Sequence, residues 1–157
     1  MATSTRNVLL GAANRSTTDG GSGGFGGRRQ VRVLIAEDDE ALRQVIARVL
    51  ADEGYAIDEA KNGFELLAML MRAADAYDVV VSDIGMPGLT GIDVIDELRA
   101  HPTLKGASIP VILVTAFADT QTRAEADRLR ALLLEKPVDM DELKDAVADL
   151  VEPTLVG

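Results

Sequence analysis

The chain has 157 residues, a formal net charge of −10, one histidine and no cysteine. This composition excludes disulfides, cysteine-based metal sites and thiol catalysis, and the single histidine excludes multi-histidine metal sites. The acidic balance argues against direct binding of nucleic acid, and no apolar run is long enough for insertion into a membrane. The apolar patch near the N-terminus is too short for a signal peptide, so we expect a cytoplasmic protein.

The chain begins with a segment of distinct composition, residues 1–29. This segment holds seven of the 14 glycines, and its four arginines against one aspartate give it a charge of +3. We predict a disordered Gly/Ser-rich N-terminal tail over 1–29, a folded domain over 30–152 and a short C-terminal tail over 153–157. A solvated extension is the favoured interpretation of the first tail, and contact with an acidic partner or an anionic surface is the alternative.

Five short apolar runs alternate with five helical patterns in the folded part. The predicted strands are 31–36, 55–60, 79–81, 110–114 and 131–134. The first helix is expected to begin after a cap at Asp39 and the second after a turn at Asn62-Gly63. The third is expected to begin at a capping pair of Thr90 and Asp93, the fourth near Thr120, and the fifth after a cap at Asp139. Their apolar stripes include Val45, Phe64 and Leu150.

Continuous apolar strands that alternate with amphipathic helices indicate a parallel sheet covered on both faces. We therefore predict a flavodoxin-like, doubly wound, five-stranded parallel sheet in the order 2-1-3-4-5, with five helices. In that order Glu37 and Asp38 end the first strand beside Asp83 at the end of the third. Thr115 and Lys136 end the fourth and fifth strands on the same edge, so five polar side chains are expected to converge.

Each of these residues has an ordinary explanation when it is considered alone. The acidic run at Glu37 is favourable at any helix start, Thr115 is an unremarkable residue at a strand end, and Lys136 is typical of a solvated turn. His101, a lone histidine before a proline, is interpreted as a surface residue with no role in a site. The convergence of the other five residues on one edge is what favours a functional site.

Four short motifs carry a resemblance to a known family. They are Leu34-Ile35-Ala36-Glu37-Asp38, Asp83-Ile84-Gly85-Met86-Pro87-Gly88 with Gly91, Thr115-Ala116 and Lys136-Pro137. In this order and at this spacing they resemble the receiver domain of bacterial two-component response regulators, over about residues 30–152.

The resemblance implies a phosphoacceptor at Asp83 and a bound Mg²⁺. Asp38 and Asp83 would be direct ligands of the metal, Gly85 would supply its backbone carbonyl, and Glu37 would act through a water molecule. Oxygen ligands of this kind suit Mg²⁺. The resemblance also implies a phosphate contact for Lys136 and for the hydroxyl of Thr115, a cis bond between Lys136 and Pro137, and phosphoryl transfer from a histidine kinase or a histidine phosphotransfer protein.

The sequence departs from the family pattern in three places. Leu133 stands where the family usually places Tyr or Phe, so the usual aromatic switch is not expected. Leu129 and Arg130 stand where a glycine usually precedes the last strand. The chain stops at Gly157, so we expect a stand-alone receiver with no output domain.

Without an output domain, the signal is expected to leave through the surface formed by the helix at 120–130, the strand at 131–134 and the helix after Asp139. A downstream protein target is one candidate occupant of that surface, and a homodimer is the other, because the first helix carries three arginines and the second is acidic. Two other functions stay open. One is a degenerate receiver that binds partners constitutively. The other is a phosphatase with an aspartyl nucleophile, which is disfavoured because Gly85 stands where such enzymes carry a second Asp.

Overall fold

The computed structural model describes residues 29–152. The predicted tails, at residues 1–28 and 153–157, lie outside the described residues. Arg29, which the composition assigns to the N-terminal tail, is described, and its Nη2 lies 2.7 Å from Oδ1 of Asp78. This ion pair holds the start of the described chain beside the strand that contains Asp83.

The predicted alternation of strands and helices is confirmed. The strands are β1 (Arg32–Ala36), β2 (Ala56–Ala60), β3 (Val79–Asp83), β4 (Val111–Thr115) and β5 (Leu132–Glu135). The helices are α2 (Glu40–Asp52), α3 (Gly63–Ala73), α4 (Gly91–Arg99), α5 (Thr120–Arg128) and α6 (Met140–Val151), with a 3-10 turn η2 (Ala74–Ala76) after α3. All strand pairs are parallel and the sheet order is β2-β1-β3-β4-β5, which is the predicted flavodoxin-like topology.

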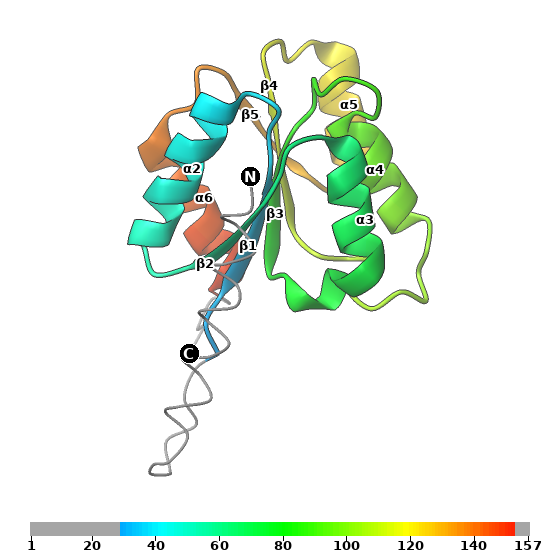
Figure 1. The fold of residues 1–157 in the computed structure, drawn as a ribbon. Coiled ribbons are helices and arrows are strands. Elements are labelled where there is room, and N and C mark those ends of the chain that lie inside the picture. The colour runs from blue at the N-terminus through cyan, green and yellow to red at the C-terminus, as the bar shows by residue number, and fades with distance from the viewer. Residues whose placement is uncertain (1–28, 153–157) are drawn as a thin grey trace, which may run out of the picture.

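Helices cover both faces of the sheet. Figure 1 shows α2 and α6 on one side and α3, α4 and α5 on the other. Successive strand residues point to opposite faces, so Leu34 packs in the core under α3 to α5 while Val33 and Ile35 pack in the core under α2 and α6. Burial on both faces explains why these strands are apolar without alternation.

The helix starts follow from side-chain capping. Asp39 accepts the backbone N–H groups of Ala41 and Leu42, and Thr90 forms a reciprocal capping box with Asp93. Asp139 caps α6 in the same way as Asp39 caps α2. Asn62, expected in a turn, is the cap of α3, because its side chain accepts the N–H of Glu65.

Three residues of the predicted apolar stripes do not lie in the core. Val45, Phe64 and Leu150 are 48%, 62% and 37% exposed. In α3 the buried face is formed by Leu66 and Leu70, because these residues meet the sheet, and Phe64 lies outside it. The predicted helix periodicity is correct, but the assignment of these three residues to the buried faces is wrong. Within residues 29–152, none of the helices is long and apolar enough to cross a lipid bilayer.

Candidate functional site

Three carboxylates meet at the carboxyl edge of the sheet. Glu37 follows β1 directly, Asp38 is the next residue, and Asp83 is the last residue of β3, the neighbour of β1. One carboxylate oxygen from each residue lies within 4.8 Å of the others. The edge at which the strand order reverses is where open parallel sheets bind ligands, so the fold places these acids at a favourable position.

The acid cluster, defined as Glu37, Asp38 and Asp83, is partly withdrawn from water. Glu37 is 2% and Asp83 is 5% exposed, while Asp38 faces solvent. Burial raises the pKa of Glu37 to about 7, the N–H bond from Asp39 opposes this, and the charge of Asp83 adds to it. Burial, with the charge of Asp83 adding to it, therefore lets Glu37 hold a proton near neutral pH.

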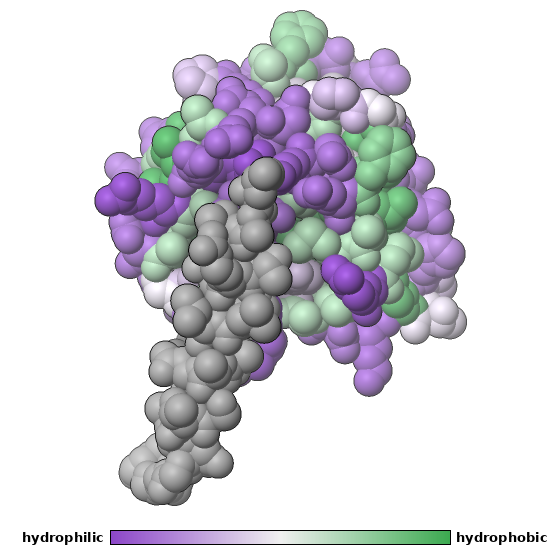
Figure 2. Space-filling model, viewed as in Figure 1, coloured by the Kyte–Doolittle hydropathy of each residue, from purple (hydrophilic) through white to green (hydrophobic). Residues whose placement is uncertain are grey.

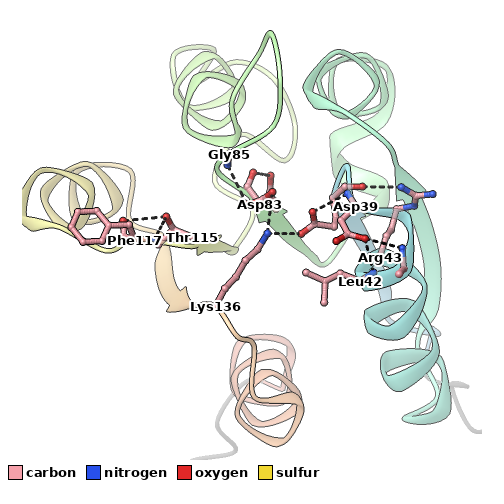
Figure 3. Close-up of polar contacts among 11 residues, drawn as sticks. Asp39, Leu42, Arg43, Asp83, Gly85, Thr115, Phe117 and Lys136 are labelled. Carbon is pink, nitrogen blue, oxygen red and sulfur yellow. Dashed lines mark hydrogen bonds and ion pairs between the residues drawn. The ribbon is translucent and has the colours of Figure 1, made fainter.

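Lys136 supplies positive charge at the centre of the site. Its Nζ lies 3.3 Å from Oε1 of Glu37 and 3.3 Å from Oδ2 of Asp83 (Figure 3). Burial alone lowers the pKa of Lys136, but the charges of Asp83 and Glu37 outweigh burial and raise it. One ammonium against three carboxylates leaves a formal charge of −2 when all of them are ionised. The peptide bond from Lys136 to Pro137 is cis, as the family resemblance implies.

The loop after β3 wraps around Asp83. The N–H of Gly85 donates to Oδ1 of Asp83 at 3.1 Å, and the hydroxyl of Ser82 donates to the Asp83 carbonyl at 3.0 Å. Gly91, the first residue of α4, lies so close to this carbonyl that a Cβ there would clash with it. These contacts fix one carboxylate oxygen of Asp83 and leave the other toward Lys136.

Thr115 lies at the same edge, but its side chain is not joined to the acid cluster. Its Oγ1 donates to the carbonyl of Phe117 and accepts the N–H of Phe117, both at 3.2 Å. Figure 3 shows this pair apart from the contact between Lys136 and Asp83. The backbone links the two places, because the carbonyl of Thr115 accepts the N–H of Lys136 at 2.8 Å.

Arg43 is a site residue that the sequence reasoning missed. It is 6% exposed, its Nη1 donates to the carbonyl of Glu37 at 2.9 Å, and its Nε bonds Oε1 of Glu59 at 3.0 Å. Arg43 therefore holds the backbone that carries two of the three acids. The signal was present, because Arg43 falls on the same helix face as Ile46 and Leu50, where an arginine needs a buried partner.

The two sequence departures near β5 have structural counterparts. Leu133 is partly buried and packs against the core under α3 to α5. Arg130 has a φ of 56°, in the left-handed region that favours glycine, and it is the one non-glycine residue with positive φ within residues 29–152. Arg130 thus stands where the family usually has a glycine, and its backbone adopts the left-handed conformation that glycine favours.

Comparison with known proteins identifies the family. The sequence pattern of the response regulator receiver domain matches residues 33–148. This chain belongs to the response regulator receiver domain family. The receiver of a Francisella response regulator, 1452, has a similar fold, with a TM-score of 0.69 and 32% identity over 78% of this chain and 97% of that one.

Two curated relatives show the same domain within longer proteins. The regulatory protein AtoC of Escherichia coli is 39% identical over 71% of this chain and 23% of its own length. The response regulator MprA of Mycobacterium ulcerans is 34% identical over 75% of this chain and 56% of its own length. The chain thus spans about a quarter to about half of these relatives.

Family membership gives the site a general meaning. Receiver domains belong to two-component systems, partner with histidine kinases and are typically phosphoacceptors rather than catalysts. An acid cluster such as Glu37, Asp38 and Asp83 is typical of the Mg²⁺ site of a receiver.

Proposed function

We propose that this receiver accepts a phosphoryl group on Asp83 and thereby switches the binding of a protein partner. The observation that carries the proposal is the contact of one ammonium, Lys136 Nζ, with both Asp83 and Glu37 at 3.3 Å beside a third carboxylate. A buried acid cluster with too few cations is suited to bind a divalent metal and a transferable anion. A purely structural cluster would be expected to balance its charges internally.

The donor set fits Mg²⁺. All candidate ligands are oxygens: the carboxylates of Asp38 and Asp83, the carbonyl of Gly85, and Glu37 through a water molecule. At about 4 Å and an effective dielectric constant near 20, each pair of ionised acids repels by roughly 4 kcal/mol before screening. When bound, Mg²⁺ supplies positive charge that offsets this repulsion and that of an incoming phosphoryl group.

The transfer step requires a nucleophile, a leaving group and a counter-charge. An oxygen of Asp83 forms a bond to phosphorus while the P–N bond to the histidine of the donor breaks. The imidazole nitrogen keeps the electron pair of that bond and takes up a proton. Lys136 then exchanges its contact with the ionised Asp83 for a contact with a phosphoryl oxygen, because its ammonium sits on a flexible stem.

The switch is proposed to begin at Thr115. Its hydroxyl donates to the carbonyl of Phe117, so a hydrogen bond from this hydroxyl to a phosphoryl oxygen on Asp83 requires that donated bond to break. The loop after β4 would then move with Thr115. Leu133 has no aromatic ring to follow this movement, so the change is expected to centre on residues 116–119.

The outgoing signal is proposed to use the surface of α5, β5 and α6. Phe117 is 71% and Leu132 is 44% exposed beside this surface. Arg128 of α5 already pairs with Asp96 and Glu125, at 3.0 Å and 2.7 Å. Less positive charge is therefore left on α5 to pair with the acidic helix α6 of a second copy. A heterologous protein target is therefore preferred over a homodimer.

Intact-mass analysis after incubation with acetyl phosphate and Mg²⁺ tests this function. We expect one phosphoryl adduct, loss of the adduct in EDTA, and none in Asp83→Asn. An adduct retained by Asp83→Asn would overturn the assignment of the acceptor. No adduct on the wild type would favour the degenerate receiver, and steady release of phosphate from many phosphomonoesters would favour the phosphatase.

A further inference from the structure

Helix α3 is apolar on more of its circumference than the core requires. Of its 11 residues, only Glu65 and Arg72 are charged. Leu66 and Leu70 are fully buried against the sheet, whereas Phe64, Leu67 and Met71 lie on a second face that is partly or largely exposed. A helix that is hydrophobic almost all round is expected to be covered almost all round, but within residues 29–152 the second face of α3 is covered only in part.

This second face borders a groove of about 460 Å³ between α3 and α4. The groove is lined by three apolar residues and three acids, namely Leu67, Met71 and Leu89 with Asp93, Asp96 and Glu97. Figure 2 shows hydrophobic surface gathered over the α3 side of the molecule, with hydrophilic residues beside it. The apolar surface continues past the groove, because the ring of Phe64 packs on Gly88, where a Cβ would lie 2.8 Å from it.

We propose that the groove between α3 and α4 is the docking site of the chain's own N-terminal segment, residues 6–15. This segment reads Arg-Asn-Val-Leu-Leu-Gly-Ala-Ala-Asn-Arg. Val8 to Leu10 is the one run of three large apolar residues in the first 28 positions, and an arginine stands at each end of the segment. Apolar residues flanked by cations match an apolar floor with an acidic rim.

The charges on the rim remain favourable after internal pairing is counted. Asp96 pairs with Arg128, which also pairs with Glu125, so this group of three keeps a formal charge of −1. Glu97 contacts only the side chain of His101 among the ion pairs of residues 29–152, and histidine is formally neutral at pH 7. Arg6 and Arg15 of the segment would therefore face a rim that carries net negative charge.

The chain is long enough for this contact. The ion pair between Arg29 and Asp78 fixes where the segment's connection begins, and Asp78 lies seven residues after Met71 of the groove. Seven residues separate two points by at most about 25 Å. The 13 residues between Arg15 and Arg29 include six glycines, and a connection of this composition spans roughly 20 Å on average and about 45 Å at full extension.

The absence of cysteine makes a direct test available, because Ala13→Cys creates a single attachment point for a nitroxide spin label. Paramagnetic broadening of backbone amides is then measured on the full chain. We expect at least a several-fold intensity loss at Leu67, Met71 and Glu97, and little at α2 and α6. Broadening spread evenly over both faces, or no broadening, would overturn the proposal.

Matched variants identify the interactions that hold the segment. Leu9→Asp with Leu10→Asp should abolish the localised broadening, whereas Thr17→Asp with Thr18→Asp, which adds the same charge outside the apolar run, should retain it. On the groove side, Glu97→Lys should weaken it and Asp149→Lys, at an exposed acid of α6, should not. Equal effects of the two members of either pair would contradict the proposed contacts.

A mixed sample separates the chain's own segment from that of a second copy. Spin-labelled chains without isotope are mixed with ¹⁵N chains that carry no label. The proposal predicts no broadening of α3 and α4 in this sample. Broadening that appears there would assign the groove to a contact between two copies and would overturn docking within one chain.

Discussion

Two acidic clusters at opposite ends of the sheet are handled in different ways. At the carboxyl edge, Glu37, Asp38 and Asp83 lie together, and one cation, Lys136, contacts two of them, Glu37 and Asp83. At the amino edge, Asp58 and Asp78 are matched by two cations, as Arg32 Nη2 lies 3.5 Å from Oδ2 of Asp58 and Arg29 Nη2 lies 2.7 Å from Oδ1 of Asp78.

Hydrogen bonds add to the ion pairs at the amino edge. The hydroxyl of Tyr77 donates to Oδ2 of Asp58 at 2.7 Å, and the N–H of Arg32 donates to Oδ2 of Asp78 at 2.9 Å. Burial raises the pKa of Tyr77, and its bond to Asp58 raises it further, so Tyr77 stays a donor at neutral pH. Among the side-chain atoms of residues 29–152, one oxygen, Oδ1 of Asp58, is buried without a hydrogen-bond partner.

The difference in charge balance distinguishes a cluster that stabilises the fold from a cluster that binds a ligand. A cluster that balances its charges contributes to the fold and needs nothing else. A cluster that keeps an excess of negative charge destabilises the metal-free protein and is retained for what it binds. The carboxyl edge is therefore assigned to chemistry and the amino edge to stability, and each of the following changes tests that division.

The largest effect is expected from neutralising one acid at the carboxyl edge. Asp38→Asn should slow formation of the phosphoryl adduct by at least about 100-fold, more than the loss typical of an outer partner of a metal site. Asp39→Asn makes the same chemical change at the adjacent residue, and Asn still caps α2, so the adduct should form normally. Equal losses in the two variants, followed by intact mass against time, would contradict a specific ligand role for Asp38.

At the amino edge, the expected loss is in stability. Arg32→Met leaves Asp58 buried without its cation and should lower the free energy of unfolding by about 3 kcal/mol, measured by urea titration. Arg29→Met removes a more exposed pair and should lower it by less than about 1 kcal/mol. Both variants should still form the adduct under native conditions. A variant that stays fully stable but cannot be phosphorylated would break the division between the two edges.

A pH series should reveal the excess charge at the carboxyl edge. Because the pKa of Glu37 is raised from 4.5 to about 7, the folded state holds a proton that the unfolded state releases between these values. The contribution of Glu37 to stability therefore falls as pH rises from 4.5 to 7, by an amount on the order of 2–3 kcal/mol, and stays low above pH 7.

Urea titrations in EDTA at pH 5, 6, 7 and 8 measure this contribution as the difference between wild type and Glu37→Gln. We expect Glu37→Gln to remove the fall. Saturating Mg²⁺ should restore stability to the wild type at pH 8, by about 2.7 kcal/mol at a concentration 100 times its dissociation constant. A wild type and variant with parallel pH profiles would contradict an excess of charge at Glu37.

The smallest effect is expected away from both clusters. Arg130→Gly relieves a left-handed backbone and should stabilise the fold by about 0.5–1 kcal/mol, because the strain of an L side chain there exceeds the entropy cost of glycine. Arg128→Gly, in the last turn of α5, should instead destabilise the fold. Adduct formation should be unchanged by Arg130→Gly. Destabilisation by Arg130→Gly would show that its side chain contributes more than its backbone strain removes.

The sequence was sufficient to predict the parts of the molecule that depend on local pattern. Strand order, the caps at Asp39 and Asp139 and the gathering of Glu37, Asp38 and Asp83 follow from apolar runs that end in acids. The family motifs added the expectation of the cis bond before Pro137, which the residue types alone would not have given.

Features that depend on tertiary contacts could not be predicted. Arg43 and Glu59 are far apart in the chain and meet only because β1 and β2 pair. The hydroxyl of Thr115 bonds Phe117 because of the shape of the loop that follows β4, which no periodicity encodes. Phe64 was assigned to an apolar stripe, and its exposure became clear only once the position of the sheet defined the buried face of α3.

Chemical mapping of the phosphoryl group tests the central claim most directly. Borohydride reduces an aspartyl phosphate to an alcohol, which converts the modified aspartate to homoserine. After phosphorylation, reduction and proteolysis, peptide sequencing by mass spectrometry should find homoserine at position 83 alone. Homoserine at position 38, or a stable adduct on a hydroxyl such as that of Thr115 with position 83 unchanged, would contradict the account of the carboxyl edge.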